Sequence, residues 1–397
     1  MKIKFKLFTI VVTILVTLSC KAQQNSIVSK VENNLGGEID YTKEELQLTL
    51  TQINGNESVI GKIANDGTIH INLPETDIKA LHNKFMGSAS LSSIFEMTSC
   101  KDKDVFAKSK YDDVFSYKYN LISIYKYGIN VAYLAPVSSK EVLNNNQYHN
   151  DTLTTGSKYY FFNLDKEINF KETCIQNSFS GIYDIEMTRI SDIQLKKGWN
   201  FIKETLVETQ EYTREDYHRQ IPKKISYTNA NYKDTDIKWY INQLADDDKI
   251  QMAKKLHSLI PLTKDQFMKW MPKKLGDLSV TTKEHGNPTN GGKSKNTLHL
   301  IYANKDQKRE IDLYVVDCAK SPDDIEMINF AYAMENNGKD EKDRKPYVAQ
   351  YNKQENATRL LYKVEDRITV SALGVDMNPE ELWDYIKKMN VEKLLKK

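Results

Sequence analysis

Short segments in which apolar and polar residues alternate recur through the first half of this chain, and they constrain its fold more than any other feature. Leu46–Leu50 alternates cleanly, and Val59–Ile63 follows it. Asn65-Asp66-Gly67 then precedes Thr68–Ile71, and an Asp-Gly pair between alternating segments is a strong hairpin signal. Further strands are expected at 121–125, 130–134, 182–187 and 199–202. Many short strands with Gly and Asn turns predict an antiparallel β-sandwich over residues 38–212.

Two stretches of this half resemble segments of bacterial lipoproteins. Residues 66–74, Asp-Gly-Thr-Ile-His-Ile-Asn-Leu-Pro, are similar to a hairpin common in immunoglobulin-like and transthyretin-like β-sandwiches. Residues 195–200, Leu-Lys-Lys-Gly-Trp-Asn, are similar to a recurrent strand entry. The resemblance implies an exported, β-rich domain, and it transfers no catalytic residue to this sequence.

Helical patterns enter after residue 245. Asp246-Asp247-Asp248 precedes apolar residues at helical spacing, with acids at the positive end of the helix dipole. Thr263-Lys264-Asp265-Gln266 is a capping box for a second short helix, which Pro272 stops. Ser321 is predicted to cap a third helix, which has Pro322 at its first position and runs to about Asn336. Asn378-Pro379 opens a last helix that runs to about Leu395.

Strand patterns lie between these helices, at 278–282, 297–303, 311–318, 347–351, 358–363 and 367–373. Residues 246–397 are therefore predicted to form a smaller α+β domain with an antiparallel sheet. The polar, Tyr-bearing stretch 213–245 is predicted to be a connector. The whole chain is predicted to be an α+β protein of two domains, and its 397 residues, 40% hydrophobic and 28% charged, fit that number.

The first nineteen residues have the features of a secretory signal. Lys2, Lys4 and Lys6 form a basic start, and the run from Leu7 to Leu18 contains only apolar residues and Thr. Such a run is too short to span a bilayer as a mature helix, and a small residue follows it. We expect the chain to be exported and residues 1–19 to be removed.

The end of this run, Thr17-Leu18-Ser19-Cys20, resembles a relaxed lipobox of Bacteroidota-type lipoproteins. The resemblance implies that Cys20 becomes the mature N-terminus and carries a thioether-linked diacylglycerol and an amide-linked acyl chain such as palmitate. Residues 20–37 would then be the lipid-attachment site and tether. Because no Asp follows Cys20, the resemblance favours the outer membrane, with the protein facing the periplasm. The alternative is cleavage without lipidation, near Ala22.

The charge balance excludes two classes of partner. Removal of residues 1–19 takes three lysines and no acid, which leaves 53 basic and 54 acidic groups. A near-neutral body of mixed sign offers no electrostatic footprint for nucleic acid or for an anionic membrane face. We expect contact with a membrane through the lipid anchor only, and an envelope protein or a glycan as partner.

Three cysteines remain once Cys20 is lipidated, and in an oxidising compartment at least one must be unpaired. A Cys100–Cys174 disulfide is one hypothesis, because both residues lie in the same half of the chain. Two free, buried thiols are the alternative.

No local motif predicts a metal, a cofactor or a nucleotide. The seven histidines form no His-Glu-x-x-His pair, and the sequence contains no Cys-x-x-Cys. Residues 286–294 end in Gly-Lys-Ser but fail the spacing of a phosphate-binding loop, since Asn287 stands where the first Gly belongs. A hairpin loop explains this stretch better.

Catalytic signals are weak. Cys318, with His285 or His299 upstream in the same domain, is the only constellation with a nucleophile and a base. The more ordinary interpretation is a small buried Cys at the end of a core strand.

Tyrosine is abundant, with 23 residues against 13 phenylalanines. Tyr117, Tyr119, Tyr125 and Tyr127 are candidates for contact with a sugar or a partner, because residues two apart share a strand face. Tyrosine as an ordinary β-former on an exposed sheet is the alternative.

These observations favour a non-enzymatic, lipid-anchored envelope protein with a binding or assembly role. An envelope hydrolase with dispersed catalytic residues is the alternative.

Overall fold

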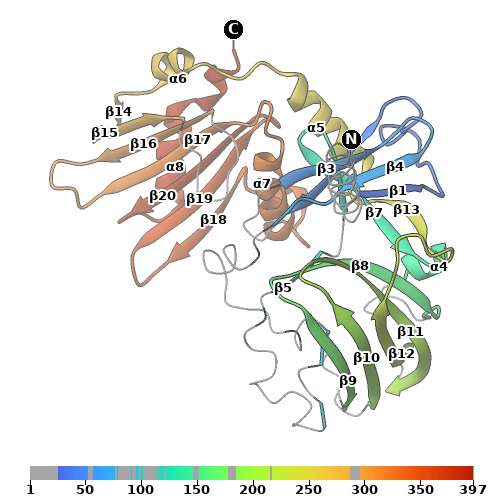
Figure 1. Cartoon of the computed structure of the whole chain (residues 1–397). Coiled ribbons are helices and arrows are strands. Elements are labelled where there is room, and N and C mark those ends of the chain that lie inside the picture. The colour runs from blue at the N-terminus through green and yellow to red at the C-terminus, as the bar shows by residue number, and fades with distance from the viewer. Residues whose placement is uncertain are drawn as a thin grey trace, which may run out of the picture. The chain divides into compact units, whose positions relative to one another are not determined.

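The computed structural model describes residues 26–51, 57–76, 78, 91, 95–97, 100–101, 114, 116–119, 122–145, 152–177, 185–214, 217–286 and 296–396. The chain divides into two compact units (Figure 1). The first comprises residues 1–126 and 130–244, and the second comprises 127–129 and 245–397. The fold is mostly β, with few helices.

Strands dominate the described part of the first unit. They are β1 (Ser26–Lys30), β2 (Leu46–Thr51), β3 (Glu57–Ile63), β4 (Thr68–Asn72), β5 (Ser116–Tyr119), β6 (Ile122–Lys126), β7 (Ile129–Val137), β8 (Gly156–Leu164), β9 (Ile168–Gln176), β10 (Met187–Leu195), β11 (Gly198–Arg214), β12 (Tyr217–Asn229) and β13 (Lys238–Gln243). One short helix, α4 (Lys140–Leu143), follows β7.

All thirteen strands join in one hydrogen-bonded sheet of order β1-β4-β3-β2-β6-β7-β8-β11-β12-β10-β9, with β13 on β7 and β5 on β8. The prediction of a purely antiparallel sheet is wrong, because β10 runs parallel to β12, with Arg189 opposite Ile225. The sheet is therefore mixed. β11 and β12 form a long antiparallel hairpin, and β12 lies between β11 and β10 in the sheet. Because the hairpin reverses the chain, β12 runs parallel to β10.

The hairpin predicted at Asp66-Gly67 is confirmed as the β3–β4 connection. The Asp66 carboxylate accepts hydrogen bonds from the Thr68 amide and hydroxyl, and Gly67 has the positive φ that this turn needs. The two stretches quoted for their resemblance meet in the structure, because the Trp199 indole donates to the Pro74 carbonyl at 2.7 Å.

Two predicted linkers are corrected. Residues 213–245 are not a connector, since they hold the end of β11 and all of β12 and β13. The polar residues that suggested a linker lie on long strands whose outer faces are exposed. The predicted tether, 20–37, contains β1, which pairs with β4 through Ser26–Lys30. Ile27 is 2% exposed, so pairing and burial override the polar composition.

The described elements of the second unit are strands and helices. They are α5 (Asp247–Ser258), α6 (Lys264–Trp270), β14 (Lys274–Leu275), β15 (Leu278–His285), β16 (Thr297–Ala303), β17 (Glu310–Asp317), α7 (Asp323–Glu335), η2 (Glu341–Asp343), β18 (Tyr347–Asn352), β19 (Ala357–Val364), β20 (Ile368–Val375), α8 (Pro379–Met389) and η3 (Val391–Leu394). The strands form the predicted antiparallel sheet, in the order β14-β15-β16-β17-β20-β19-β18.

Alternation along β17 divides the apolar packing of this unit between two sides of the sheet. Val315 belongs to the main core, in which the α8 residues Leu382 and Ile386 also lie. Val316 faces the other way and packs with Leu256 of α5 and Ile325 of α7. The period of two therefore explains how helices cover both faces of one sheet.

The N-termini of two helices match their sequence signals, and that of a third does not. The capping box of Thr263 and Gln266 is confirmed, with both reciprocal bonds present. Asn378 caps α8 by accepting from the Glu381 amide at 2.9 Å. Ser321, however, does not cap α7: Pro322 occupies the N-cap position, and no side-chain bond caps the helix. The last helix ends at Met389, because Asn390 takes a left-handed conformation with φ 52°.

Candidate functional site

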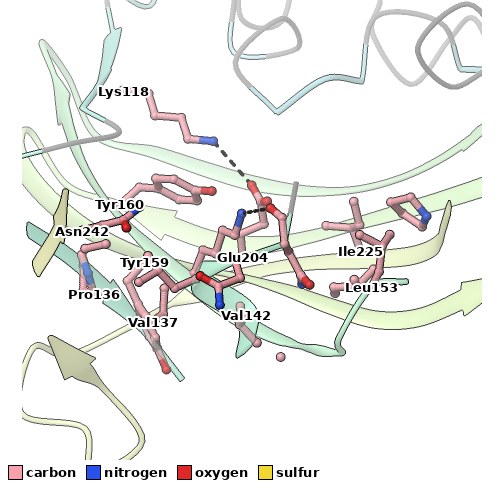
Figure 2. Close-up of a pocket in the computed structure, with 18 of the residues that line it drawn as sticks. Lys118, Pro136, Val137, Val142, Leu153, Tyr159, Tyr160, Glu204, Ile225 and Asn242 are labelled. Atoms are coloured by element: carbon pink, nitrogen blue, oxygen red, sulfur yellow. Dashed lines mark hydrogen bonds and ion pairs between the residues drawn. The ribbon is translucent and has the colours of Figure 1, made fainter. Parts of the chain in front are cut away.

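A cavity of about 760 Å³ lies in the first unit. Its lining comes from β7, α4, β8, β10, β11, β12 and β13, together with Glu96 and the β5 residue Lys118. Figure 2 shows Lys118 and Glu204 reaching toward each other across it, and Val142, Leu153 and Ile225 beside them. The volume is in the range of small-molecule sites, about 300–1,000 Å³.

Strand register explains why charges line this cavity. Lys158 of β8 lies opposite Glu204 of β11, and Glu204 lies opposite Tyr227 of β12, so the three side chains share one face of the sheet. Two residues farther along β8 and β11 the same face carries Tyr160 and Ile202, and it then continues into the apolar core around Phe162. One sheet face is therefore core at one end and cavity wall at the other.

Two ion pairs are formed between residues that line the cavity. The Lys118 ammonium lies 3.4 Å from a Glu204 carboxylate oxygen and 3.8 Å from the centre of the Tyr160 ring (Figure 2). Arg189, whose side chain is 3% exposed, pairs with Glu96 and donates to the Tyr227 hydroxyl at 2.8 Å. The Arg189 Nε has no hydrogen-bond partner among the described residues. Both acids of the wall are thus engaged by a cation.

Lys158 is the third cation of the wall. Its ammonium donates to the Asn145 backbone carbonyl at 3.2 Å, and no carboxylate of the described residues lies within ion-pair distance. Burial lowers the pKa of Lys158, the charge of Lys118 lowers it further, and Glu204 opposes both effects. A cation here is incompletely compensated.

Tyr160 and Tyr227 have raised pKa values. Burial raises the pKa of Tyr160 and of Tyr227, and the negative charge of Glu204 adds to each shift. On another wall, Asn242 donates to the Tyr133 hydroxyl. These hydroxyl and amide groups can act as hydrogen-bond partners for a ligand.

The apolar wall depends on one glycine. A Cβ on Gly156 would lie 2.3 Å from Val142 Cγ2 and 2.7 Å from Ser138 Oγ, and the glycine has φ 150°. Only glycine lets the start of β8 approach α4 this closely. Val142 thereby lines the cavity together with Val137 and Leu153.

The predicted tyrosine cluster is not brought together as one described surface. Tyr117 and Tyr119 lie on β5, and their side chains are outside the described residues. Tyr125, on β6, is half-buried and donates to Glu57. Tyr127 lies in the turn after β6 with φ 55°, so it does not share a strand face with Tyr125. Of the two whose side chains are described, Tyr125 and Tyr127, neither lines the cavity.

The weak catalytic candidates occupy separate environments. Cys318 is buried with Leu256, Val316 and Ile325, and this burial raises the pKa of its thiol. His299 interacts with Asp312 at 2.8 Å and stacks on a neighbouring tyrosine. His285 packs near Phe267, and burial lowers its pKa. A thiol with a raised pKa in an apolar cluster is a poor nucleophile.

The structure links Cys100 to Cys174 in a disulfide, with the Cα atoms 5.1 Å apart. Of the two alternatives for this pair, the linked one is present. Cys318 is a free, buried thiol. Cys20 and most of the Gly-Lys-Ser stretch at 286–294 lie outside the described residues.

Among the described residues, no group of three or more His, Cys, Asp or Glu side chains could hold a metal ion. Within the same part of the chain, no helix has the length and apolar character needed to cross a membrane. No protein-family model, no curated protein and no solved structure matches this chain.

Sequence reasoning missed this cavity. Its charged residues are spread from Glu96 to Glu204, and none belongs to a motif. One signal was present: Lys158 stands on the strand face that also carries Tyr160 and Phe162, and Phe162 is in the apolar core. A lysine on the buried face of a strand is uncommon unless it is paired or functional.

Proposed function

We propose that this protein is an exported, lipid-anchored binding protein of the cell envelope, and that the cavity of the first unit holds its ligand. The cavity carries the proposal, because it combines apolar walls with a few converging polar groups. The ligand is a small molecule with a polar end and an apolar body. The predicted immunoglobulin-like or transthyretin-like sandwich, the partner protein or glycan, and the alternative of a hydrolase stay predictions.

Two features support the envelope location. The signal-like start and the lipobox-like Cys20 are properties of the sequence. The Cys100–Cys174 disulfide is consistent with an oxidising compartment outside the cytoplasm. The proposed site of anchoring is the outer membrane, with the protein facing the periplasm. Two acyl signals hold a protein durably on a bilayer.

The anchoring is tested by intact mass and membrane fractionation of the full chain beside Cys20→Ala. We expect acyl chains on residue 20 and membrane association, both lost in the variant. An unmodified mature chain that does not fractionate with membranes would contradict the anchor.

The binding role is tested by filling the cavity. Leu206 lines it and Val207, its neighbour on β11, is 44% exposed and does not line it. The full chain, Leu206→Trp and Val207→Trp would be purified from cells under native conditions, and their small-molecule content compared by solvent extraction and mass spectrometry. We expect a molecule in near-stoichiometric amount with the full chain and with Val207→Trp, and its loss from Leu206→Trp. Equal content in all three proteins would refute a ligand in this cavity.

A further inference from the structure

The charges on the cavity wall do not cancel. Among the described lining residues, Lys118, Lys158 and Arg189 are cationic, and Glu96 and Glu204 are anionic. Each acid already has a cation partner, Lys118 for Glu204 and Arg189 for Glu96. One positive charge, that of Lys158, is left over.

Lys158 has few ways to compensate this charge within the described structure. Its ammonium donates to one backbone carbonyl, that of Asn145, and an ammonium group has three hydrogens to donate. Burial disfavours the charged form, as the lowered pKa of Lys158 indicates. A ligand that brings a single negative charge would neutralise the wall and provide a further acceptor.

The rest of the ligand must suit an aliphatic surface. Val137 is the strand partner of Lys158 on β7, and Val142, Leu153 and Ile225 continue the lining. Figure 2 labels these four side chains among those that line the cavity. The cavity wall therefore changes from one ammonium group without a carboxylate partner to a surface of branched aliphatic side chains.

We propose, on the basis of the binding role proposed above, that the ligand is an amphipathic monoanion, a carboxylate on an aliphatic chain, whose negative group contacts Lys158. Each methylene that leaves water contributes about 0.8 kcal/mol to binding, and the ion pair with Lys158 selects the head group. A dianion or a polyanion would leave negative charge uncompensated, because only one cation of the described wall lacks a carboxylate.

The test uses three probes that share one chain and differ in charge: decanoate, decanol and decylamine. Isothermal titration of the purified full chain gives their affinities. We expect decanoate to bind at least about tenfold more tightly than decanol, the ratio that 1.4 kcal/mol represents, and decylamine to bind most weakly.

Three variants locate the effect. Lys158→Met is expected to bind decanoate no better than decanol. Lys171→Met is the matched control, since Lys171 is exposed, pairs with Asp192 and does not line the cavity, and it is expected to bind as the parent does. Glu204→Gln removes a negative charge and frees Lys118, so it is expected to bind decanoate more tightly than the parent.

The outcomes separate this inference from the proposed function. Decanoate and decanol that bind equally to the parent, or a Lys158→Met variant that keeps the preference, would overturn the monoanion while leaving a binding cavity. A chain that binds none of the three probes would overturn this inference, and retention of a native ligand in the cavity-filling experiment would still support the binding role.

Discussion

In the second unit, the main buried face of the sheet is filled by leucine, isoleucine and valine side chains, whereas the corresponding face in the first unit changes along its strands from apolar to charged. Leu300, Leu313 and Val370 exemplify the filled face and are 0% exposed. Phe162 and Lys158, four residues apart on β8, mark the change. The same alternation of residues thus builds a closed core in one unit and the wall of a cavity in the other.

Asp317, buried in the second unit, and Lys158, half-buried in the first, differ in how fully their charge is compensated. Asp317 in the second unit is 0% exposed and accepts from the Leu262 amide at 2.7 Å, the Ala319 amide at 3.1 Å and the Arg367 guanidinium at 2.9 and 3.1 Å. Lys158 in the first unit has one carbonyl partner and an open cavity beside it. Full compensation indicates a structural role, and incomplete compensation beside a cavity indicates a ligand site.

The largest expected effect comes from breaking the compensated charge. Asp317→Ala leaves the Arg367 guanidinium and two buried amides without their acceptor, which should destabilise the second unit by about 3–5 kcal/mol. Hydrogen exchange followed by mass spectrometry, read from peptides of each unit, measures it. The control is Asp384→Ala, an exposed partner of Lys387, for which no change is expected. A stable Asp317→Ala protein would show that the network is dispensable.

Loss of the disulfide should destabilise the first unit by a comparable amount. It joins residues 74 positions apart in the first unit, and a loop of this length corresponds to about 4 kcal/mol of unfolded-state restriction. Reduction, or the double change Cys100→Ser and Cys174→Ser, should lower the urea resistance of the first unit alone. Equal loss in the peptides of the second unit would contradict independent stabilisation.

Removal of the Lys158 charge should stabilise the folded first unit and weaken ligand binding in the cavity. Lys158→Met is expected to stabilise the first unit by about 1 kcal/mol at neutral pH. The pKa of Lys158 is lowered from 10.5 in the folded state, so the unfolded chain binds this proton more readily than the folded protein does. For this group, the parent is therefore most stable above pH 10.5. This stability is lost as the pH falls through the folded-state pKa. Urea unfolding between neutral pH and pH 10.5 should therefore show the variant's advantage shrinking as the pH rises. An advantage that is absent at neutral pH, or that grows with pH, would contradict this account.

The smallest effect is expected at Cys318. Burial raises the pKa of its thiol, so iodoacetamide should leave it unmodified in the folded protein and label it after denaturation. Peptide mass spectrometry measures the labelled fraction. Labelling of the folded protein at the rate of a free thiol would bring back the catalytic interpretation of this residue.

The sequence predicted local structure best where the signal itself is local. The Asp66-Gly67 hairpin, the capping box at Thr263 and the Asn378 cap each depend on residues within three or four positions, and each is present. The failures have non-local causes. Residues 213–245 have the composition of a linker, but they pair with β11, β7 and β10. β12 runs parallel to its neighbour β10 because the β11–β12 hairpin reverses the chain before β12.

By itself, then, the sequence predicted export and a Cys20 suited to lipidation, and it indicated a β-rich first half and a mixed second half, because composition, periodicity and short motifs are readable along the chain. Tertiary structure alone decided that Lys158, Glu204 and Arg189 share a cavity wall, and that Cys318 is enclosed by apolar side chains. Strand register sets these neighbours, and register depends on the pairing of strands far apart in sequence.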